Sequence, residues 1–262
     1  MELVIETNNL EKKYKDFKAI KNLNMHLEKG AIYGLIGKNG AGKTTLIRLI
    51  CGLQEPTSGT YTIYGVKNTD KKIIDVRKRV GAIIESPSIY QNMTARDNII
   101  EQLKLIGSPS LDEVSDLLKL VGLEHTGKKK VKNFSLGMKQ RLGIAIALAT
   151  NPDLLILDEP INGLDPEGIV EIRELILNLN HKKRITILIS SHYLDELSKI
   201  ATYYGFVDNG QIIKEISSAE LNKKMEQKIE IKVLDIKEFV KYFEKYNYTY
   251  EVVDNNTINV YG

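Results

Sequence analysis

A glycine-rich segment constrains this chain more than any other feature. Residues 37–44 read GKNGAGKT and match the pattern G-x-x-x-x-G-K-[ST]. An apolar run, Ala31–Ile36, precedes the segment, and a helical pattern from Lys43 to about Cys51 follows it. Glycines let the backbone turn its N–H groups onto phosphate oxygens, and the positive end of the following helix adds to the attraction. The segment therefore predicts a P-loop, a strand, loop and helix that bind nucleotide phosphates.

Two side chains of the P-loop have specific expected roles. Lys43 is expected to reach the β- and γ-phosphates of ATP, and the Thr44 hydroxyl is expected to bind Mg²⁺. The alternative, a glycine turn that only caps a structural helix, does not explain a lysine and a threonine at the end of the pattern. We expect ATP and Mg²⁺ as cofactors, with further nucleotide contacts from Gly37, Lys38, Asn39, Gly40, Ala41, Gly42 and Thr45.

A second motif supplies acidic groups. The apolar strand pattern Leu154–Leu157 is followed directly by Asp158 and Glu159. A carboxylate at the carboxyl end of a buried strand can orient a metal-bound water, so Asp158 is an expected Mg²⁺ ligand. Glu159 is the expected general base for the attacking water. Taken alone, such a motif is usually a strand that reaches solvent, but the P-loop upstream favours the functional interpretation.

The order of apolar patterns predicts an α/β protein with a mixed sheet. Strand patterns dominate the first 84 residues, beginning with Leu3–Ile5 and then Lys18–Leu27. Residues 94–150 are mainly helical, with a break at Gly107–Pro109. We therefore expect an inserted helical subdomain over about residues 86–150. Beyond it strand and helix patterns alternate again, which implies a parallel sheet covered by helices.

Two domains are expected along the chain. Residues 1–210 contain the motifs above and predict the ATP-binding domain. After Gly210 the sequence changes to short lysine-rich and tyrosine-rich elements that end in a possible strand, Thr257–Tyr261. Residues 211–262 therefore predict a small C-terminal α+β appendage, either a regulatory or docking piece or a simple stabilising extension.

The order of these motifs resembles the nucleotide-binding domains of ABC transporters over about residues 1–210. Residues 134–140, FSLGMKQ, stand where that family has a signature near LSGGQ, although two of its residues are replaced here by Leu136 and Met138. Ser135 can cap the following helix, and with the Gly137 amide it can form a second anion site. In the family that site contacts the γ-phosphate held by the opposite subunit. The alternative is an ordinary N-capped amphipathic helix.

The resemblance also implies roles for isolated residues. Asp165, in the segment GLDP, resembles the family's D-loop and would lie across a dimer interface. His192 resembles the switch histidine that contacts the γ-phosphate, and Tyr14 resembles the aromatic residue that stacks on adenine. Most of the family has glutamine at the position of Glu85, where it contacts the metal and water and faces the membrane partner. Glu85 is therefore an expected catalytic and metal-binding residue, although a carboxylate only accepts hydrogen bonds.

This resemblance implies the ABC ATPase fold, with a parallel core and an antiparallel β part, and an ATPase whose hydrolysis is coupled to transport. The expected partners are transmembrane permease subunits and a second copy of the chain. Glu85–Pro87 and the signature look like the subfamily that exports bacitracin and lantibiotics. The competing interpretation is a non-transporting ABC ATPase that acts on ribosomes or DNA. A P-loop kinase would leave Ser135, Asp165 and His192 without roles.

Composition bears on partners and location. A net charge of only +3, from 37 basic and 34 acidic residues, gives no electrostatic reason to expect nucleic acid. One cysteine, Cys51, excludes an intrachain disulfide and suits a reducing compartment. The first residues lack the features of a signal peptide, and the longest apolar run falls short of the roughly 20 residues that cross a bilayer. We expect a cytoplasmic protein held at the inner face of the membrane by its partner.

Overall fold

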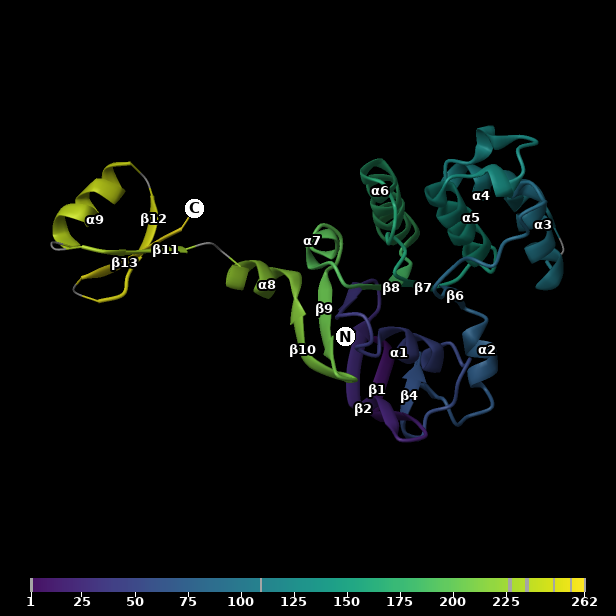
Figure 1. Ribbon diagram of the computed structural model, residues 1–262, viewed down its shortest axis with the longest axis horizontal. Coiled ribbons are helices and arrows are strands. Elements are labelled where there is room, and N and C mark those ends of the chain that lie inside the picture. The colour runs from purple at the N-terminus through teal and green to yellow at the C-terminus, as the bar shows by residue number, and fades with distance from the viewer. Residues whose placement is uncertain are drawn as a thin grey trace. The chain divides into compact units, whose positions relative to one another are not determined.

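The structure is a computed structural model that describes residues 2–108, 110–225, 228–233, 236–246, 248–254 and 256–261. Pro109, part of a predicted helix break, lies outside the described residues. The chain divides into two compact units, Met1–Ile216 and Ser217–Gly262. Figure 1 labels most of the helices and strands of both units.

Two sheets form the first unit. The larger has the strand order β10-β9-β3-β8-β7-β6, in which the five strands from β9 to β6 pair in parallel. The smaller is antiparallel and has the order β2-β1-β4-β5. The expected mixed α/β architecture is confirmed. The strands are β1 (Leu3–Tyr14), β2 (Phe17–Glu28), β3 (Ile32–Ile36), β4 (Ser58–Ile63), β5 (Val66–Lys67), β6 (Val80–Ile83), β7 (Leu154–Asp158), β8 (Thr186–Ser191), β9 (Tyr203–Asp208) and β10 (Gln211–Ser217).

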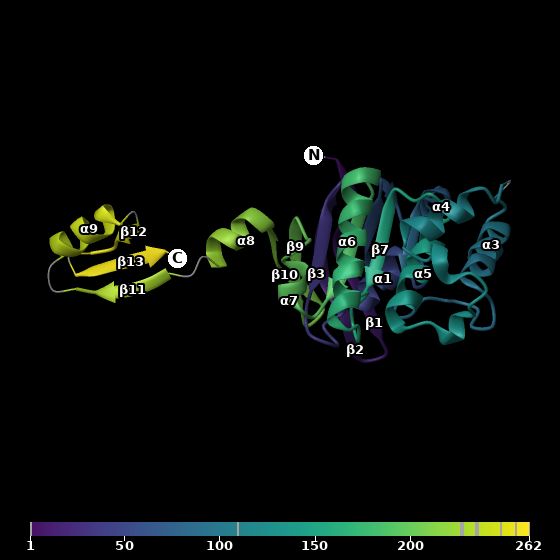
Figure 2. The same cartoon turned by 90° about the horizontal axis from the view of Figure 1, so that it is seen from above.

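Helices lie on both faces of the larger sheet. Helix α1 lies on the side of the antiparallel sheet, whereas α6 and α7 lie on the opposite side (Figures 1 and 2). Helices α3, α4 and α5 contact one another and form the insertion between β6 and β7. The helices are α1 (Lys43–Ile50), α2 (Ile73–Arg77), α3 (Ala95–Leu105), α4 (Glu113–Leu120), α5 (Leu136–Leu148), α6 (Pro166–Lys183) and α7 (Leu194–Leu197). In the described part of the chain, no helix is both long and apolar enough to cross a bilayer.

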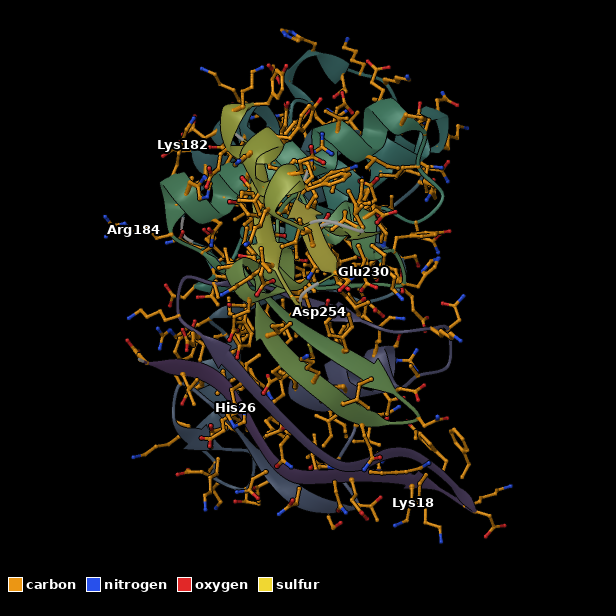
Figure 3. All side chains as sticks on the ribbon, turned by 90° about the vertical axis from the view of Figure 1, so that its left-hand side faces the viewer. Lys18, His26, Lys182, Arg184, Glu230 and Asp254 are labelled. Atoms are coloured by element: carbon orange, nitrogen blue, oxygen red, sulfur yellow. The ribbon has the colours of Figure 1, made fainter. Side chains whose placement is uncertain are left out.

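Local chemistry explains where the longest helix begins and ends. The Asp165 carboxylate caps α6 by accepting a hydrogen bond from the Gly168 N–H, and Pro166 occupies the first turn. Basic residues fill the last turn, where they oppose the negative end of the helix dipole. Arg184 then ends the helix in a left-handed conformation with φ of 56°. Figure 3 shows Lys182 and Arg184 pointing outward from this helix end.

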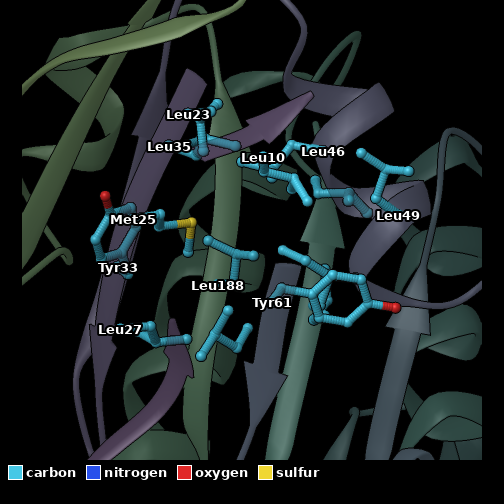
Figure 4. Packing of buried hydrophobic residues seen from close by; sticks show 14 of the residues in the cluster. Leu10, Leu23, Met25, Leu27, Tyr33, Leu35, Leu46, Leu49, Tyr61 and Leu188 are labelled. Carbon is cyan, nitrogen blue, oxygen red and sulfur yellow. The ribbon is translucent and has the colours of Figure 1, made fainter. Parts of the chain in front are cut away.

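A hydrophobic core joins the two sheets through α1. Leu10 and Met25 of the antiparallel sheet pack with Leu35 of β3, Leu46 of α1 and Leu188 of β8 (Figure 4). All of these side chains are fully buried. Burial of a large aliphatic side chain contributes about 1.5–3 kcal/mol, so this core fixes β3 and α1, and thereby the loop between them.

The first strand is longer than its apolar pattern suggests. The sequence predicts a strand at Leu3–Ile5, but β1 continues to Tyr14. Register shifts interrupt its pairing with β2, and Asn9 adopts a positive φ of 46°. Such bulges break the alternation of buried and exposed residues on which strand prediction relies.

The second unit has its own small core. It contains α8 (Ser218–Met225), α9 (Ile236–Lys245) and a three-stranded antiparallel sheet, ordered β11-β13-β12, formed by β11 (Lys228–Lys232), β12 (Thr249–Val252) and β13 (Thr257–Tyr261). Val233, Phe243 and Ile258 are buried at its centre. The predicted C-terminal strand coincides with β13. Strand β10, beyond residue 210, is part of the larger sheet and belongs to the first unit.

Candidate functional site

The P-loop lies between β3 and α1, and two of its glycines leave no room for a side chain. A Cβ atom on Gly37 would lie 2.4 Å from the Val207 carbonyl oxygen, and one on Gly42 would lie 2.8 Å from that of Ala19. Gly42 also has a φ of 112°, which side chains rarely tolerate. The Gly37 N–H donates to the Ser191 carbonyl at 3.3 Å, so the loop is attached to the end of β8.

Lys43 is buried beneath this loop. Its ammonium group donates hydrogen bonds to the carbonyl oxygens of Gly37, at 2.6 Å, and Lys38, at 3.3 Å. It also lies 3.1 Å from Oε1 of Glu159. The side chain is only 6% exposed, so its charge is held under the P-loop by oxygen atoms of the protein itself. Among the other predicted loop contacts, Lys38, Asn39 and Gly40 are exposed, Ala41 is buried, and Thr45 is half-buried in α1.

Thr44 and Asp158 meet at the carboxyl ends of the parallel strands. The Thr44 hydroxyl donates to Asp158 Oδ2 at 2.8 Å, and the Ser190 hydroxyl donates to Asp158 Oδ1 at 2.5 Å. Asp158 is 1% exposed and Ser190 is fully buried. Ser190 was not predicted from the sequence. The feature that brings Ser190 to Asp158 is the register of β7 and β8, which pairs these two residues directly.

Glu159 adopts a strained backbone conformation and reaches into the same place. Its φ is 50°, and its N–H donates to the Ser190 hydroxyl at 2.9 Å. Its Oε2 lies 2.9 Å from Nδ1 of His192. Its Oε1 is buried and, among the described residues, accepts no hydrogen bond, although the Lys43 ammonium is at ion-pair distance. This carboxylate therefore keeps one oxygen that can still accept a proton or a hydrogen bond.

Two predicted residues lie apart from the cluster around Lys43, which consists of Lys43, Thr44, Asp158, Glu159, Ser190 and His192. The described contact of Glu85 is an ion pair of 2.7 Å with Arg48 of α1, not a contact with Thr44 or Asp158. The Glu85 side chain is 63% exposed, and its φ is 62°. Tyr14 lies at the tip of the β1–β2 hairpin, is 40% exposed, and donates its hydroxyl hydrogen bond to Oε1 of Gln54.

The signature and D-loop residues lie beside each other at the starts of α5 and α6. The Ser135 hydroxyl caps α5 by accepting from the Met138 N–H at 3.2 Å. A Cβ atom on Gly137 would lie no closer than 3.9 Å to its neighbours, which are Gly168 and Leu164. In the described part of the chain, no hydrogen bond or ion pair joins Ser135 to its own P-loop.

The comparisons with known proteins decide the family. The model of the ABC transporter family matches residues 20–162, more than half of the chain. The chain belongs to the ABC transporter family. Within the family it is similar to the bacitracin transport ATP-binding protein BcrA of Bacillus licheniformis, with 43% identity over 264 residues that cover 100% of this chain and 86% of BcrA.

Two further relatives agree with this result. The lantibiotic transport ATP-binding protein SrtF of Streptococcus pyogenes is 45% identical over 212 residues, which cover 81% of this chain and 90% of SrtF. The ATP-binding cassette MJ0796, solved as a dimer in a post-hydrolysis state with ADP and Pi, has a TM-score of 0.72 and 26% identity, covering 82% of this chain and 98% of the cassette. This ABC protein is therefore an ATP-binding subunit, an ATPase of a transport system.

Proposed function

We propose that this ATPase subunit drives export of an antimicrobial peptide of the bacitracin or lantibiotic class through separate transmembrane subunits. The observation that carries the proposal is the 43% identity to BcrA along the whole chain. The similarity to SrtF supports the same substrate class. Both names concern transport, so they do not favour the alternative of an ATPase that acts on ribosomes or DNA.

The cluster around Lys43 supports a specific division of roles. Lys43 binds the β- and γ-phosphates, for which its buried charge and its position under the loop are suited. Thr44 and Asp158 hold Mg²⁺, since a hydroxyl and a carboxylate 2.8 Å apart offer the hard oxygen ligands that this ion prefers. The described residues include no group of three or more His, Cys, Asp or Glu that could hold a metal, which fits an ion bound mainly through one carboxylate and phosphates.

Three other residues of the same copy contribute to the proposed site. Glu159 is the general base that accepts a proton from the attacking water, because its buried Oε1 accepts no hydrogen bond from the described residues. His192 contacts the γ-phosphate through Nε2, while Nδ1 stays on Glu159. Tyr14 stacks on adenine with its exposed ring.

Two copies complete one site. Ser135, Gly137 and Asp165 lie at the starts of helices whose N–H groups favour anions, yet Ser135 makes no described contact with its own P-loop. We therefore assign them to the nucleotide of a second copy, as the dimeric form of the similar cassette MJ0796 suggests. Each nucleotide then lies between the P-loop of one copy and the α5 start of the other.

A cavity beside the helical insertion suits the membrane partner. It has a volume of about 510 Å³ and lies between β6, the segment Ser86–Ser88, Gln102 of α3 and the residues Gly143 to Ala147 of α5. Glu85 immediately precedes this segment, and Arg96 is exposed on α3. A cytoplasmic helix of the transmembrane subunit would dock here, which holds the ATPase at the inner face of the membrane. We assign the ATP-binding domain to the unit that ends at Ile216.

Sensitivity of a deletion strain tests the substrate class. Cells that lack this subunit are expected to become more sensitive to bacitracin or a lantibiotic, and the wild-type gene should restore resistance. A gene that encodes Glu159→Gln should not restore it. Sensitivity to an antibiotic that acts inside the cell should not change. Unaltered sensitivity to both peptide classes would remove the proposed substrate, although it would leave the ATPase assignment intact.

A further inference from the structure

The ring of Tyr193 packs against the imidazole of His192 just beyond the end of β8. The ring centroids are 3.8 Å apart, and the ring planes are inclined by 43°. The His192 side chain is only 20% exposed, whereas Tyr193 is 52% exposed. The tyrosine therefore covers one side of the histidine while much of its own surface meets solvent. Hydrophobic burial does not account for an aromatic residue at this place.

The main chain around Tyr193 ties this ring pair to the phosphate-binding loop. The Tyr193 N–H donates to the Ser191 hydroxyl at 3.0 Å, and Ser191 is fully buried at the end of β8. The Ser191 carbonyl in turn accepts the hydrogen bond from the N–H of Gly37. One buried residue thus holds both the backbone of Tyr193 and the first residue of the P-loop.

A single hydrogen bond does not fix the orientation of the His192 ring. A carboxylate can only accept, so Nδ1 of His192 carries the hydrogen in its 2.9 Å contact with Glu159. The ring torsion of histidine is broad, which lets the ring tilt about that contact and turn Nε2 away. A flat neighbour on one side restricts this tilt. A hydrogen bond from Nε2 to a phosphate oxygen needs a hydrogen on Nε2, because the phosphate oxygen only accepts.

We propose that Tyr193 is a positioning residue for ATP hydrolysis, which holds the imidazole of His192 with Nδ1 on Glu159 and Nε2 toward the γ-phosphate. The proposal rests on the proposed role of His192 as a γ-phosphate contact. The ring of Tyr193, and not its hydroxyl, contacts the imidazole. Phenylalanine should therefore serve as well, and an aliphatic residue of similar bulk should not.

Steady-state ATPase assays of the full chain test the proposal. Tyr193→Phe is expected to keep kcat within about twofold of wild type. Tyr193→Leu is expected to lower kcat about three- to tenfold, the effect of losing an aromatic pair, with KM for ATP within about twofold. Tyr246→Leu is the matched control, since Tyr246 is 54% exposed on the second unit and should have no effect. A raised KM with unchanged kcat would overturn the proposal, because Tyr193 would then contact the nucleotide itself.

Imidazole NMR gives a second measurement that does not depend on turnover. Long-range ¹⁵N–¹H spectra are expected to show His192 protonated at Nδ1 in the wild type and in Tyr193→Phe, and a mixture of tautomers in Tyr193→Leu. An unchanged spectrum in Tyr193→Leu overturns the proposal. His192→Ala distinguishes failure of the His192 assignment from failure of the Tyr193 proposal. Full ATPase activity of His192→Ala would refute the γ-phosphate contact of His192. The spectra of the Tyr193 variants test whether Tyr193 orients the His192 ring, whatever the role of His192.

Discussion

The ammonium nitrogen of Lys43 lies 3.1 Å from Oε1 of Glu159. The P-loop lysine and the carboxylate that follows β7 therefore form a buried ion pair, in which Lys43 is 6% and Glu159 18% exposed. We propose that a triphosphate bound at the loop replaces Glu159 as the partner of Lys43, since a triphosphate carries several negative charges and a carboxylate carries one. On this proposal, the exchange frees the Glu159 carboxylate to accept a proton from water.

Replacement of Glu159 by glutamine separates binding from hydrolysis. An amide cannot accept the proton of the attacking water, so Glu159→Gln should lower kcat by about 10²- to 10⁴-fold. ATP affinity should be equal to or tighter than wild type, because Lys43 loses a competing anion. Phosphate release and fluorescent-nucleotide titration measure the two effects. Glu167→Gln, an exposed change in the first turn of α6, is the control. Weaker nucleotide binding in Glu159→Gln would contradict this account of the ion pair.

Replacement by alanine should affect stability differently at Gly37 and Gly137. Gly37→Ala should destabilise the fold by about 1–3 kcal/mol, because its Cβ would meet the Val207 carbonyl at 2.4 Å. Gly137→Ala has room, with no neighbour closer than 3.9 Å, so it should keep or slightly raise the melting temperature. Its ATPase activity should nevertheless fall at least tenfold if Gly137 approaches a phosphate of the second copy. Normal activity of a stable Gly137→Ala variant would show that no phosphate comes so close.

Glu85 should matter more for transport than for hydrolysis. Its described partner is Arg48, and the Glu85 carboxylate is largely exposed, so Glu85→Gln should cost no more than about 1 kcal/mol of stability. We expect basal ATPase activity within about threefold of wild type, together with a clear loss of peptide resistance in cells. Arg48→Gln removes the same ion pair and serves as the comparison. A hundredfold loss of basal hydrolysis in Glu85→Gln alone would place Glu85 at the metal during the reaction.

Alkaline pH should weaken the fold through Tyr33. Burial, and then the charge of Glu215, raise the pKa of the Tyr33 hydroxyl well above its usual value. The unfolded chain therefore loses this proton near pH 10 while the folded chain keeps it, so the free energy of unfolding falls as pH rises above about 10. Tyr33→Phe should cost about 1 kcal/mol at pH 7.5, because it removes the hydrogen bond to Glu215.

Between pH 7.5 and 10.5 the free energy of unfolding should fall less in Tyr33→Phe than in the wild type. Urea denaturation at both pH values measures this, with Tyr242→Phe as an exposed control. Some loss should remain, since burial also raises the pKa of Tyr64, to about 12. An equally steep loss in Tyr33→Phe would show that Tyr33 does not contribute to the pH dependence.

Much of the fold could be predicted because its signals are local. The P-loop is a contiguous pattern, and Ser135 and Asp165 cap helices that begin at the next residue. Contacts that depend on pairing across the sheet could not be predicted. Ser190 reaches Asp158 only because β7 and β8 pair in one particular register.

The position of Glu85 and the length of β1 escaped prediction for the same physical reason. The motif places Glu85 at the end of β6, but its side chain turns to Arg48, which lies on a helix distant in sequence. Bulges near Asn9 conceal the second half of β1, because they shift which residues face the core. Both depend on contacts with other segments of the chain, an ion pair to α1 for Glu85 and irregular pairing with β2 for β1, rather than on a local pattern.

Molar mass in solution tests the central claim most directly. Light scattering of Glu159→Gln with ATP and Mg²⁺ should give twice the 29.6 kDa of one chain, because each nucleotide joins the P-loop of one copy to the Ser135 region of the other. The same protein without nucleotide, and a Lys43→Ala variant with it, should stay at the mass of one chain. A Glu159→Gln protein that binds ATP and yet remains at 29.6 kDa would contradict the account.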